Sequence, residues 1–270
     1  MANSAMAQQG ILFKIKYQPS HTYQNTFHVE VKPVVTVTGS QEILEKLSAM
    51  GIGQPVNADL TLDISGQTKS GYAASDGSFP IVFNYMVDSI NAKVNGKNFP
   101  SPPNKTNSKK VYAHINPDGQ LKIDSANGKK MNDSTEKKMR QMMDMVQHQI
   151  KFPDKPLKPG DTFTQGMPFT IPMKGMGDSK IDISVTYKLI SIAGDKAYFD
   201  MVENININAQ IKKATTSITG TGTGKMVYSV KDNFPISSSS VLNMKISAAM
   251  GTTTINGTTA VNVSQATTIN

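Results

Sequence analysis

The sequence predicts an α+β protein that is mostly β: a large curved antiparallel sheet or an unclosed β-barrel, with one main amphipathic helix and one short helix. Apolar and polar residues alternate along most of the 270 residues, which is typical of strands with one buried and one wet face. Turn-forming residues separate consecutive alternating segments, so we expect neighbouring strands to pair as hairpins. Two stretches with apolar residues at helical spacing interrupt the strands.

The alternating segments are long, and several cover ten or more residues. Long strands in one sheet twist and coil, so a strongly curved sheet is expected. The expected strands cover residues 11–17, 23–37, 58–64, 81–87, 111–115, 121–123, 181–189, 197–211, 226–230, 242–248 and 261–263.

Short polar sequences mark the turns between these strands. Asn95-Gly96 and Asn256-Gly257 are typical of type I′ hairpin turns, in which both central residues take a positive φ. Residues 116–119 (Asn-Pro-Asp-Gly) and 193–196 (Ala-Gly-Asp-Lys) are also expected to form turns, and Asp232-Asn233 is a weaker signal of the same kind.

Two helices are expected. The main helix runs from Ser134 to Lys151, and Asp133 with Glu136 forms a capping box at its start. The short helix runs from Gln41 to Met50, and Ser40 can cap it. The apolar face of the main helix consists of Met139, Met142, Met143, Val146 and Ile150.

The chain is expected to form one β-rich domain over residues 11–270, with a domain boundary near 152–160 as the alternative. Residues 1–10 are interpreted as a signal-peptide remnant or a disordered N-terminus, because Ala5-Met6-Ala7 is typical of the end of a secretory signal. Together with the absence of Cys and the abundance of Ser, Thr and Asn, this predicts export to the periplasm, outer membrane or cell surface of a Gram-negative bacterium. No apolar run approaches the roughly 20 residues that span a bilayer.

The positive charge is confined to one part of the chain. The net charge is +8, and residues 93–158, with 14 basic and 6 acidic residues, hold the whole excess. All basic residues except Arg140 are Lys, whereas Arg is the residue suited to bidentate contacts with phosphate and guanine. We therefore expect no nucleic-acid partner. An anionic membrane surface and a solvated lysine-rich face remain as alternatives.

Most catalytic and cofactor chemistry lacks its residues here. The chain has no Cys, and His21, His28, His114 and His148 show no metal-ligand spacing. Residues 220–225 (Gly-Thr-Gly-Thr-Gly-Lys) lack the spacing of a phosphate loop and continue into a strand. We expect no cofactor, no metal site and no enzyme activity, and a hydrolase with a dispersed site is kept as the last alternative.

A hydrophobic or amphiphilic ligand beneath the Met-rich helix is the preferred hypothesis, because Met adapts to irregular apolar partners. A structural or surface-interaction module with a filled core is the alternative. The candidate lining residues are Met139, Met142, Met143, Val146, Ile150, Phe83, Tyr85, Phe199 and Met201. Lys137, Lys138, Arg140 and Lys151 form a candidate basic rim for an anionic amphiphile. Gly220, Gly222 and Gly224 are expected to allow close approach of a helix or ligand, or a sharp bend of the sheet.

Three segments carry a resemblance to a known family: residues 13–23, residues 152–163 (Phe-Pro-Asp-Lys-Pro-Leu-Lys-Pro-Gly-Asp-Thr-Phe) and residues 220–230. They resemble uncharacterised bacterial exported proteins and lipoproteins that share a domain of unknown function. The layout is similar to periplasmic carriers such as LolA and LppX, in which a helix covers an unclosed barrel. The resemblance implies an exported protein of this architecture and transfers no catalytic residue. Phe163 stands where that family commonly has Trp.

Overall fold

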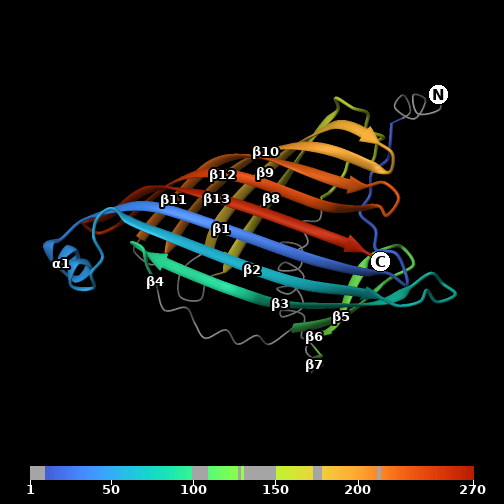
Figure 1. Ribbon diagram of the computed structural model, residues 1–270, viewed down its shortest axis with the longest axis horizontal. Coiled ribbons are helices and arrows are strands. Elements are labelled where there is room, and N and C mark those ends of the chain that lie inside the picture. The colour runs from blue at the N-terminus through green and yellow to red at the C-terminus, as the bar shows by residue number, and fades with distance from the viewer. Residues whose placement is uncertain (1–9, 99–108, 127–128, 131–149, 173–177, 212–213) are drawn as a thin grey trace.

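One antiparallel sheet of thirteen strands dominates the computed structural model (Figure 1). The structure describes residues 10–98, 109–126, 129–130, 150–172, 178–211 and 214–270. The helix is α1 (Gln41–Ala49). The strands are β1 (Thr22–Thr38), β2 (Val56–Ser70), β3 (Phe79–Val94), β4 (Lys97–Asn98), β5 (Lys109–Ile115), β6 (Leu121–Ala126), β7 (Lys129–Lys130), β8 (Thr162–Pro172), β9 (Asp178–Ala193), β10 (Lys196–Ile211), β11 (Ala214–Ser229), β12 (Phe234–Met250) and β13 (Thr253–Ile269).

The first and last long strands lie side by side in the middle of the sheet. The order is β7-β6-β5-β3-β2-β1-β13-β12-β11-β10-β9-β8, with β4 paired to β3. Strands β1 and β13 are in register from the Tyr23–Ile269 pair to the Thr38–Thr254 pair. Strands β7 and β8 follow each other in sequence but lie at opposite edges, so the sheet is not closed. The predicted mostly β architecture with a large, unclosed antiparallel sheet is confirmed.

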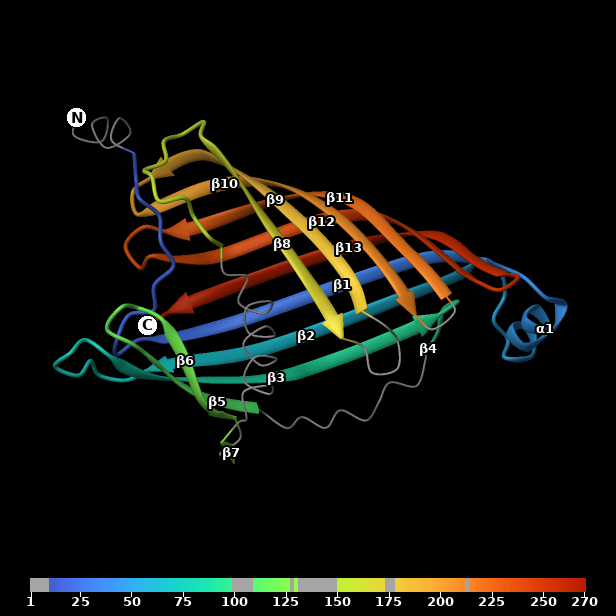
Figure 2. The same cartoon turned by 180° about the vertical axis from the view of Figure 1, so that it is seen from behind.

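The sheet curls around an interior. Strands β8 and β9 lie behind β1 and β2 in Figure 1 and in front of them when the molecule is turned (Figure 2). Helix α1 extends beyond the sheet at the end away from the C-terminus (Figure 1). It matches the predicted short helix. Most of the predicted main helix from Ser134 to Lys151 lies outside the described residues and stays a prediction, but its predicted end is wrong, because Ile150 and Lys151 are not helical.

The two faces of the sheet differ in chemistry because side chains alternate along every strand. In β1, Val29 and Val31 are half-buried on the inner face, whereas His28 and Lys32 are exposed on the outer face. Register carries this division across the sheet, since Val31 pairs with Val261 on one side and with Leu60 on the other. The inner face is therefore mainly apolar, and the outer face consists mainly of Thr, Ser, Asn and charged residues.

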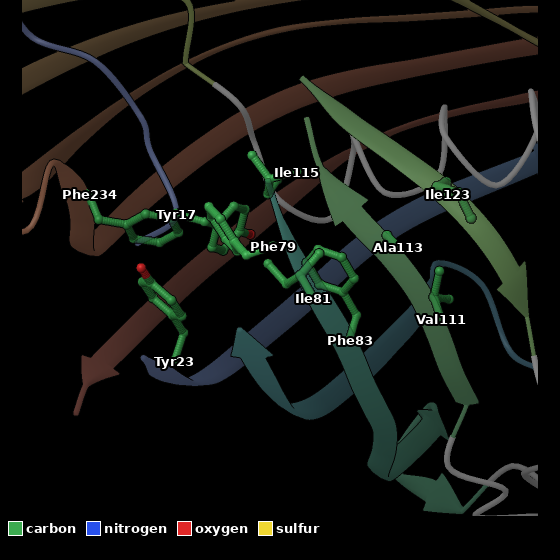
Figure 3. Packing of buried hydrophobic residues seen from close by; sticks show 10 residues of the cluster. All are labelled: Tyr17, Tyr23, Phe79, Ile81, Phe83, Val111, Ala113, Ile115, Ile123 and Phe234. Carbon is green, nitrogen blue, oxygen red and sulfur yellow. The ribbon is translucent and has the colours of Figure 1, made fainter. Parts of the chain in front are cut away.

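Two clusters of buried residues fill one end of the inner face. The first cluster consists of Tyr17, Tyr23, Phe79, Ile81, Phe83, Val111, Ala113, Ile115, Ile123 and Phe234 (Figure 3). The second cluster consists of Phe13, Leu157, Val185, Tyr187, Leu189, Ala197, Phe199, Met201, Met226 and Tyr228. The first cluster joins Phe234 of β12 to residues of β1, β3, β5 and β6, whereas the strand residues of the second cluster come from the neighbouring strands β9, β10 and β11.

The N-terminal segment, residues 11–20, crosses the packed end and joins the two clusters. Phe13 is buried in the second cluster and Tyr17 in the first. The Tyr228 hydroxyl donates a hydrogen bond to the Lys14 carbonyl, and the Tyr23 hydroxyl accepts one from the Gln18 backbone N–H at 2.8 Å.

The prediction of a strand over residues 11–17 is wrong. Only an isolated bridge from Ile11 to Leu157 is present there. The segment alternates because every second side chain inserts into the core, although its backbone does not pair with a neighbouring strand.

The turn predictions hold with one exception. Asn95 and Gly96 take positive φ values of 47° and 78° and connect β3 to β4. Asn256-Gly257 is not a turn but lies inside β13, where the turn before it is at Gly251. A side chain at Gly257 would collide with Val34 and Val35 of β1, so this glycine is explained by close strand approach.

Replacing Phe13 by Ala is expected to lower the free energy of unfolding by about 3–5 kcal/mol, as for other buried aromatic residues. The Phe13 ring is 2% exposed and lies 5.1–5.3 Å from the rings of Phe152, Phe199 and Tyr228. Urea denaturation measures the change. Leu12→Ala is the matched control, because Leu12 is 42% exposed and should change stability by no more than about 0.5 kcal/mol. Equal losses in the two variants would show that the segment does not hold the clusters together.

Candidate functional site

A cavity of about 90 Å³ opens beside the first cluster, on the inner face of β1, β2 and β3. Its walls combine aromatic and aliphatic side chains with a few polar residues. They are Tyr17, Asn25, Thr26, Phe27, Ile64, Gly66, Gln67, Thr68, Phe83, Asn84, Tyr85, Phe234 and Gln265. Pockets that enclose a whole small ligand measure roughly 300–1,000 Å³, so this cavity suits one end of a longer molecule.

Tyr85, one of the lining residues, carries a polar atom that lacks a partner. Its hydroxyl is buried and has no hydrogen-bond partner in the part of the chain that the structure describes. Burial also raises the pKa of the Tyr85 phenol, so it stays protonated at neutral pH. An unpartnered buried hydroxyl costs about 1–3 kcal/mol, so this position lowers the stability of the fold.

Gly66 is another lining residue and neighbours Tyr85 on the adjacent strand. Gly66 pairs with Tyr85 in the β2–β3 register, and a β-carbon there would lie 3.5 Å from the Tyr85 β-carbon. The absent side chain thus leaves room beside Tyr85.

Beyond the two clusters, the inner face is apolar but only half-buried. We call this part the distal half; it leads to the end of the sheet that carries α1. Its half-buried side chains include Val35, Val56, Ile90, Ile205, Ile246 and Ile255. Apolar surface that stays partly exposed is typical of an interaction site.

The structure separates the predicted lining residues. Phe83 and Tyr85 line the cavity, whereas Phe199 and Met201 are buried in the second cluster and Ile150 packs against that cluster. Met139, Met142, Met143 and Val146 lie outside the described residues, so their role in lining a ligand site stays a prediction.

Of the predicted basic rim, the structure describes Lys151. Its side chain is exposed, and its backbone N–H donates to the Gln165 Oε1 atom at 2.9 Å. Lys137, Lys138 and Arg140 lie outside the described residues.

Glu203 is a functional candidate that the sequence interpretation missed. It stands on the inner face of β10 between Met201 and Ile205, opposite Val185 of β9 and Gly222 of β11. Among the described side chains on the inner face of β8 to β13, it is the only acidic or basic one. The signal was present in the sequence, since a Glu interrupts the apolar positions 197, 199, 201, 205 and 207.

Burial raises the pKa of the Glu203 carboxyl above its usual value, although a hydrogen bond from the Ser240 side chain of β12 opposes the shift. Tyr187 of β9 is the titratable neighbour on the same face, and burial together with the Glu203 charge keeps its phenol protonated. The carboxylate therefore lies at the border between the packed second cluster and the distal half, where it is partly removed from water.

The three predicted close-approach glycines of β11 lie against β12. A β-carbon on Gly220 would lie 2.5 Å from the Met244 Cγ atom, and one on Gly222 would lie 2.8 Å from the Leu242 Cγ atom. A β-carbon on Gly224 would lie 2.6 Å from the Met201 Cε atom. Side chains of the sheet itself thus occupy the space above these glycines.

A His, an Asp and a Ser come together on the outer face. The His28 Nδ1 atom lies 2.6 Å from the Asp63 Oδ1 atom, and the Ser89 hydroxyl donates to Asp63 Oδ2 at 2.6 Å. These bonds lower the pKa of the Asp63 carboxyl. The Asp stands between the other two residues, whereas a nucleophilic Ser must contact the His, and His28 is 47% exposed. The arrangement fits a surface hydrogen-bond network.

Within the described ranges, no three His, Asp or Glu side chains are grouped as metal ligands would be. Over the same ranges, no helix has the length and apolar character needed to cross a membrane.

No protein-family model matches the chain, and no curated protein sequence is similar to it. Solved structures align over most of the chain with low similarity. A bacterial polysaccharide outer membrane secretin is 8% identical over 89% of this chain and 97% of that chain, with a TM-score of 0.26. The β domain of the Bordetella autotransporter Brka is 8% identical over 92% and 99%, with a TM-score of 0.21. OccK7 (OpdD) of Pseudomonas aeruginosa is 5% identical over 92% and 99%, with a TM-score of 0.20. TM-scores this low support no argument about function.

The raised pKa of Glu203 predicts a pH dependence of stability. The folded state binds the Glu203 proton more tightly than the unfolded state, so the free energy of unfolding falls as pH rises above about 4.5. Glu203→Gln, which mimics the protonated form, should be more stable than the wild type at neutral pH, and the two should converge at acid pH. Urea denaturation midpoints across this range measure the difference. Asp200→Asn removes a carboxylate from the exposed outer face of the same strand and should not reproduce the gain; a pH-independent difference for Glu203→Gln would contradict the assignment.

Adding a methyl group to the glycine track should destabilise the sheet. Gly222→Ala would place a β-carbon 2.8 Å from the Val241 carbonyl oxygen, and overpacking of this kind costs about 1–3 kcal/mol. The matched control is Gly166→Ala in β8, where no atom lies within 4 Å of the added carbon and a gain of about 0.5–1 kcal/mol is expected. Thermal denaturation compares the two, and a stabilised Gly222→Ala variant would disprove the close approach.

Proposed function

We propose that this chain is a non-enzymatic, exported envelope protein that holds a hydrophobic or amphiphilic small molecule against the inner face of its sheet. The observation that carries the proposal is the cavity beside the first cluster, whose lining combines apolar residues such as Phe27 and Ile64 with polar ones such as Gln67. Sites for small molecules are typically concave and mostly apolar, with a few polar groups that orient the ligand.

The size and position of the cavity suggest how the ligand lies. At about 90 Å³ it exceeds the ~30 Å³ that one water molecule occupies in the liquid, yet it is too small for a whole lipid. It adjoins the distal half, whose half-buried Val35 and Ile90 side chains continue the apolar surface. We therefore propose that one end of the ligand enters the cavity and the remainder lies along the distal half, where its burial removes apolar area from water.

The proposed location in the envelope rests on the sequence. The residues before Ile11 are typical of a secretory signal end, and the resemblance of residues 152–163 to exported proteins and lipoproteins points the same way. The family resemblance and the LolA-like layout are part of this proposal.

Binding of N-phenylnaphthylamine, a neutral apolar fluorophore, tests the proposal. The wild-type protein should bind it saturably and release it when a long-chain alcohol is added. Ile64→Trp fills the cavity, because Ile64 is one of its lining residues, and should weaken binding at least about tenfold, equivalent to about 1.4 kcal/mol. The chain has no Trp, so the indole emission of the variant also reports on its own environment.

Met86→Trp is the matched control, since Met86 follows Tyr85 on β3 but is 42% exposed on the outer face. It should bind the fluorophore as the wild type does, and circular dichroism checks that both variants are folded. Absence of saturable binding to the wild type would refute the proposed function. Unchanged binding in a folded Ile64→Trp variant would show that this cavity is not the site.

A further inference from the structure

Glu203 is placed where a ligand on the inner face would meet it. On one side along β10 is the buried Met201 of the second cluster, and on the other is the half-buried Ile205 of the distal half. On the neighbouring strands, Val185 is buried and Gly222 has no side chain. The carboxylate thus lies where the distal half, which is the apolar surface proposed for the ligand, meets the second cluster.

The described side chains around Glu203 supply no countercharge. Among the described side chains on the inner face of β9 to β13, none is a Lys, Arg or His. The Ser240 side chain offers one hydrogen bond, and Tyr187 is a buried phenol. A partly desolvated carboxylate with one neutral partner retains unused acceptor capacity, and burial of a charge is costly unless it is paired.

Several charged residues elsewhere in the sheet have partners of opposite charge. Lys32 and Glu30 pair at 2.6 Å, and Lys225 and Asp200 at 3.4 Å, on the exposed outer face. Glu203 differs from these residues because its side chain is on the inner face. It occupies an odd-numbered position of β10, as Phe199 and Met201 do.

We infer that Glu203 sets the head-group preference of the inner face: it selects amphiphiles with a cationic nitrogen, such as a long-chain amine, and disfavours long-chain carboxylates. This inference rests on the proposed function. An ammonium group can donate to the free carboxylate oxygen and neutralise its charge, and a charge-assisted bond of this type is roughly twice as strong as a neutral one. A carboxylate head group would instead place two like charges together in partly desolvated surroundings.

The distance along the sheet is compatible with a single ligand that reaches both features. Strand β1, which lines the cavity, is four strands from β10 in the sheet order, a path of about 19 Å at ~4.8 Å per strand. The head group would then lie at Glu203 while the apolar chain runs toward Phe27 and Ile64 of the cavity.

Displacement of N-phenylnaphthylamine by three probes of equal chain length tests the inference at neutral pH: dodecylamine, dodecanol and dodecanoate, each below its micellar concentration. The wild type should bind dodecylamine at least about tenfold more tightly than dodecanoate, with dodecanol between them. In Glu203→Gln the affinities for amine and carboxylate should come within about twofold of each other. Asp200→Asn removes a carboxylate from the outer face of the same strand and should keep the wild-type order.

The outcomes separate the inference from the function on which it rests. If the fluorophore and all three probes fail to bind, the proposed function is refuted. If they bind with equal affinity, if dodecanoate binds most tightly, or if the preference for amine persists in Glu203→Gln, the inference is overturned while the proposed function stands. Tight binding of dodecanoate would instead support the anionic ligand expected from the basic rim of Lys137, Lys138, Arg140 and Lys151.

Discussion

The pairing of the first strand with the last is the contact on which the rest of the structure depends. Strands β1 to β7 and strands β8 to β13 form two runs of neighbouring hairpins, and the β1–β13 ladder joins them into one sheet. Without it, each run would expose an edge, and the first cluster would be separated from Phe234. Phe234, at the start of β12, packs with Tyr17 and Tyr23, so the first cluster requires both runs. The N-terminal segment adds a second link, since Phe13 and Tyr17 belong to different clusters.

This topology leaves the inner face unevenly filled. Aromatic residues from strands of both runs and from the N-terminal segment meet at one end, where side chains such as Tyr23 and Leu189 are fully buried. Toward α1 the same alternation continues with Val and Ile, which are smaller and remain half-buried. Both features that carry the functional argument, the cavity at Tyr85 and the carboxylate of Glu203, lie at the transition between these two regions. A ligand site at this transition needs no rearrangement of the packed end.

Local patterns account for much of the fold. Period-two alternation predicted most strands, and the capping and spacing of residues 41–50 predicted α1, because these properties depend on near neighbours. The same pattern misled at residues 11–17, where the segment alternates into a core without a partner strand, and at Asn256-Gly257, where a neighbouring strand explains the glycine. The order of strands could not be predicted, since the β1–β13 pairing joins residues that are more than 200 positions apart. Alternation within one strand predicted Phe83 and Tyr85 as lining residues. Their neighbours in the cavity, Tyr17, Phe27 and Phe234, come from other parts of the chain and could not be predicted in the same way.

Glu203 shows how a departure from pattern can locate function. Local propensity, alternation and register agree along β10 that position 203 belongs to the buried face, and the residue there contradicts all three. Such conflicts reduce stability, so they are expected mainly at functional or strained sites. The backbone around Glu203 shows no positive φ in β10, and its neighbours Val185 and Met201 are ordinary core residues, so strain does not explain the position. Among the described residues this charge has no countercharge, and it lies at the edge of a half-buried apolar surface; a ligand that completes both is the simplest explanation.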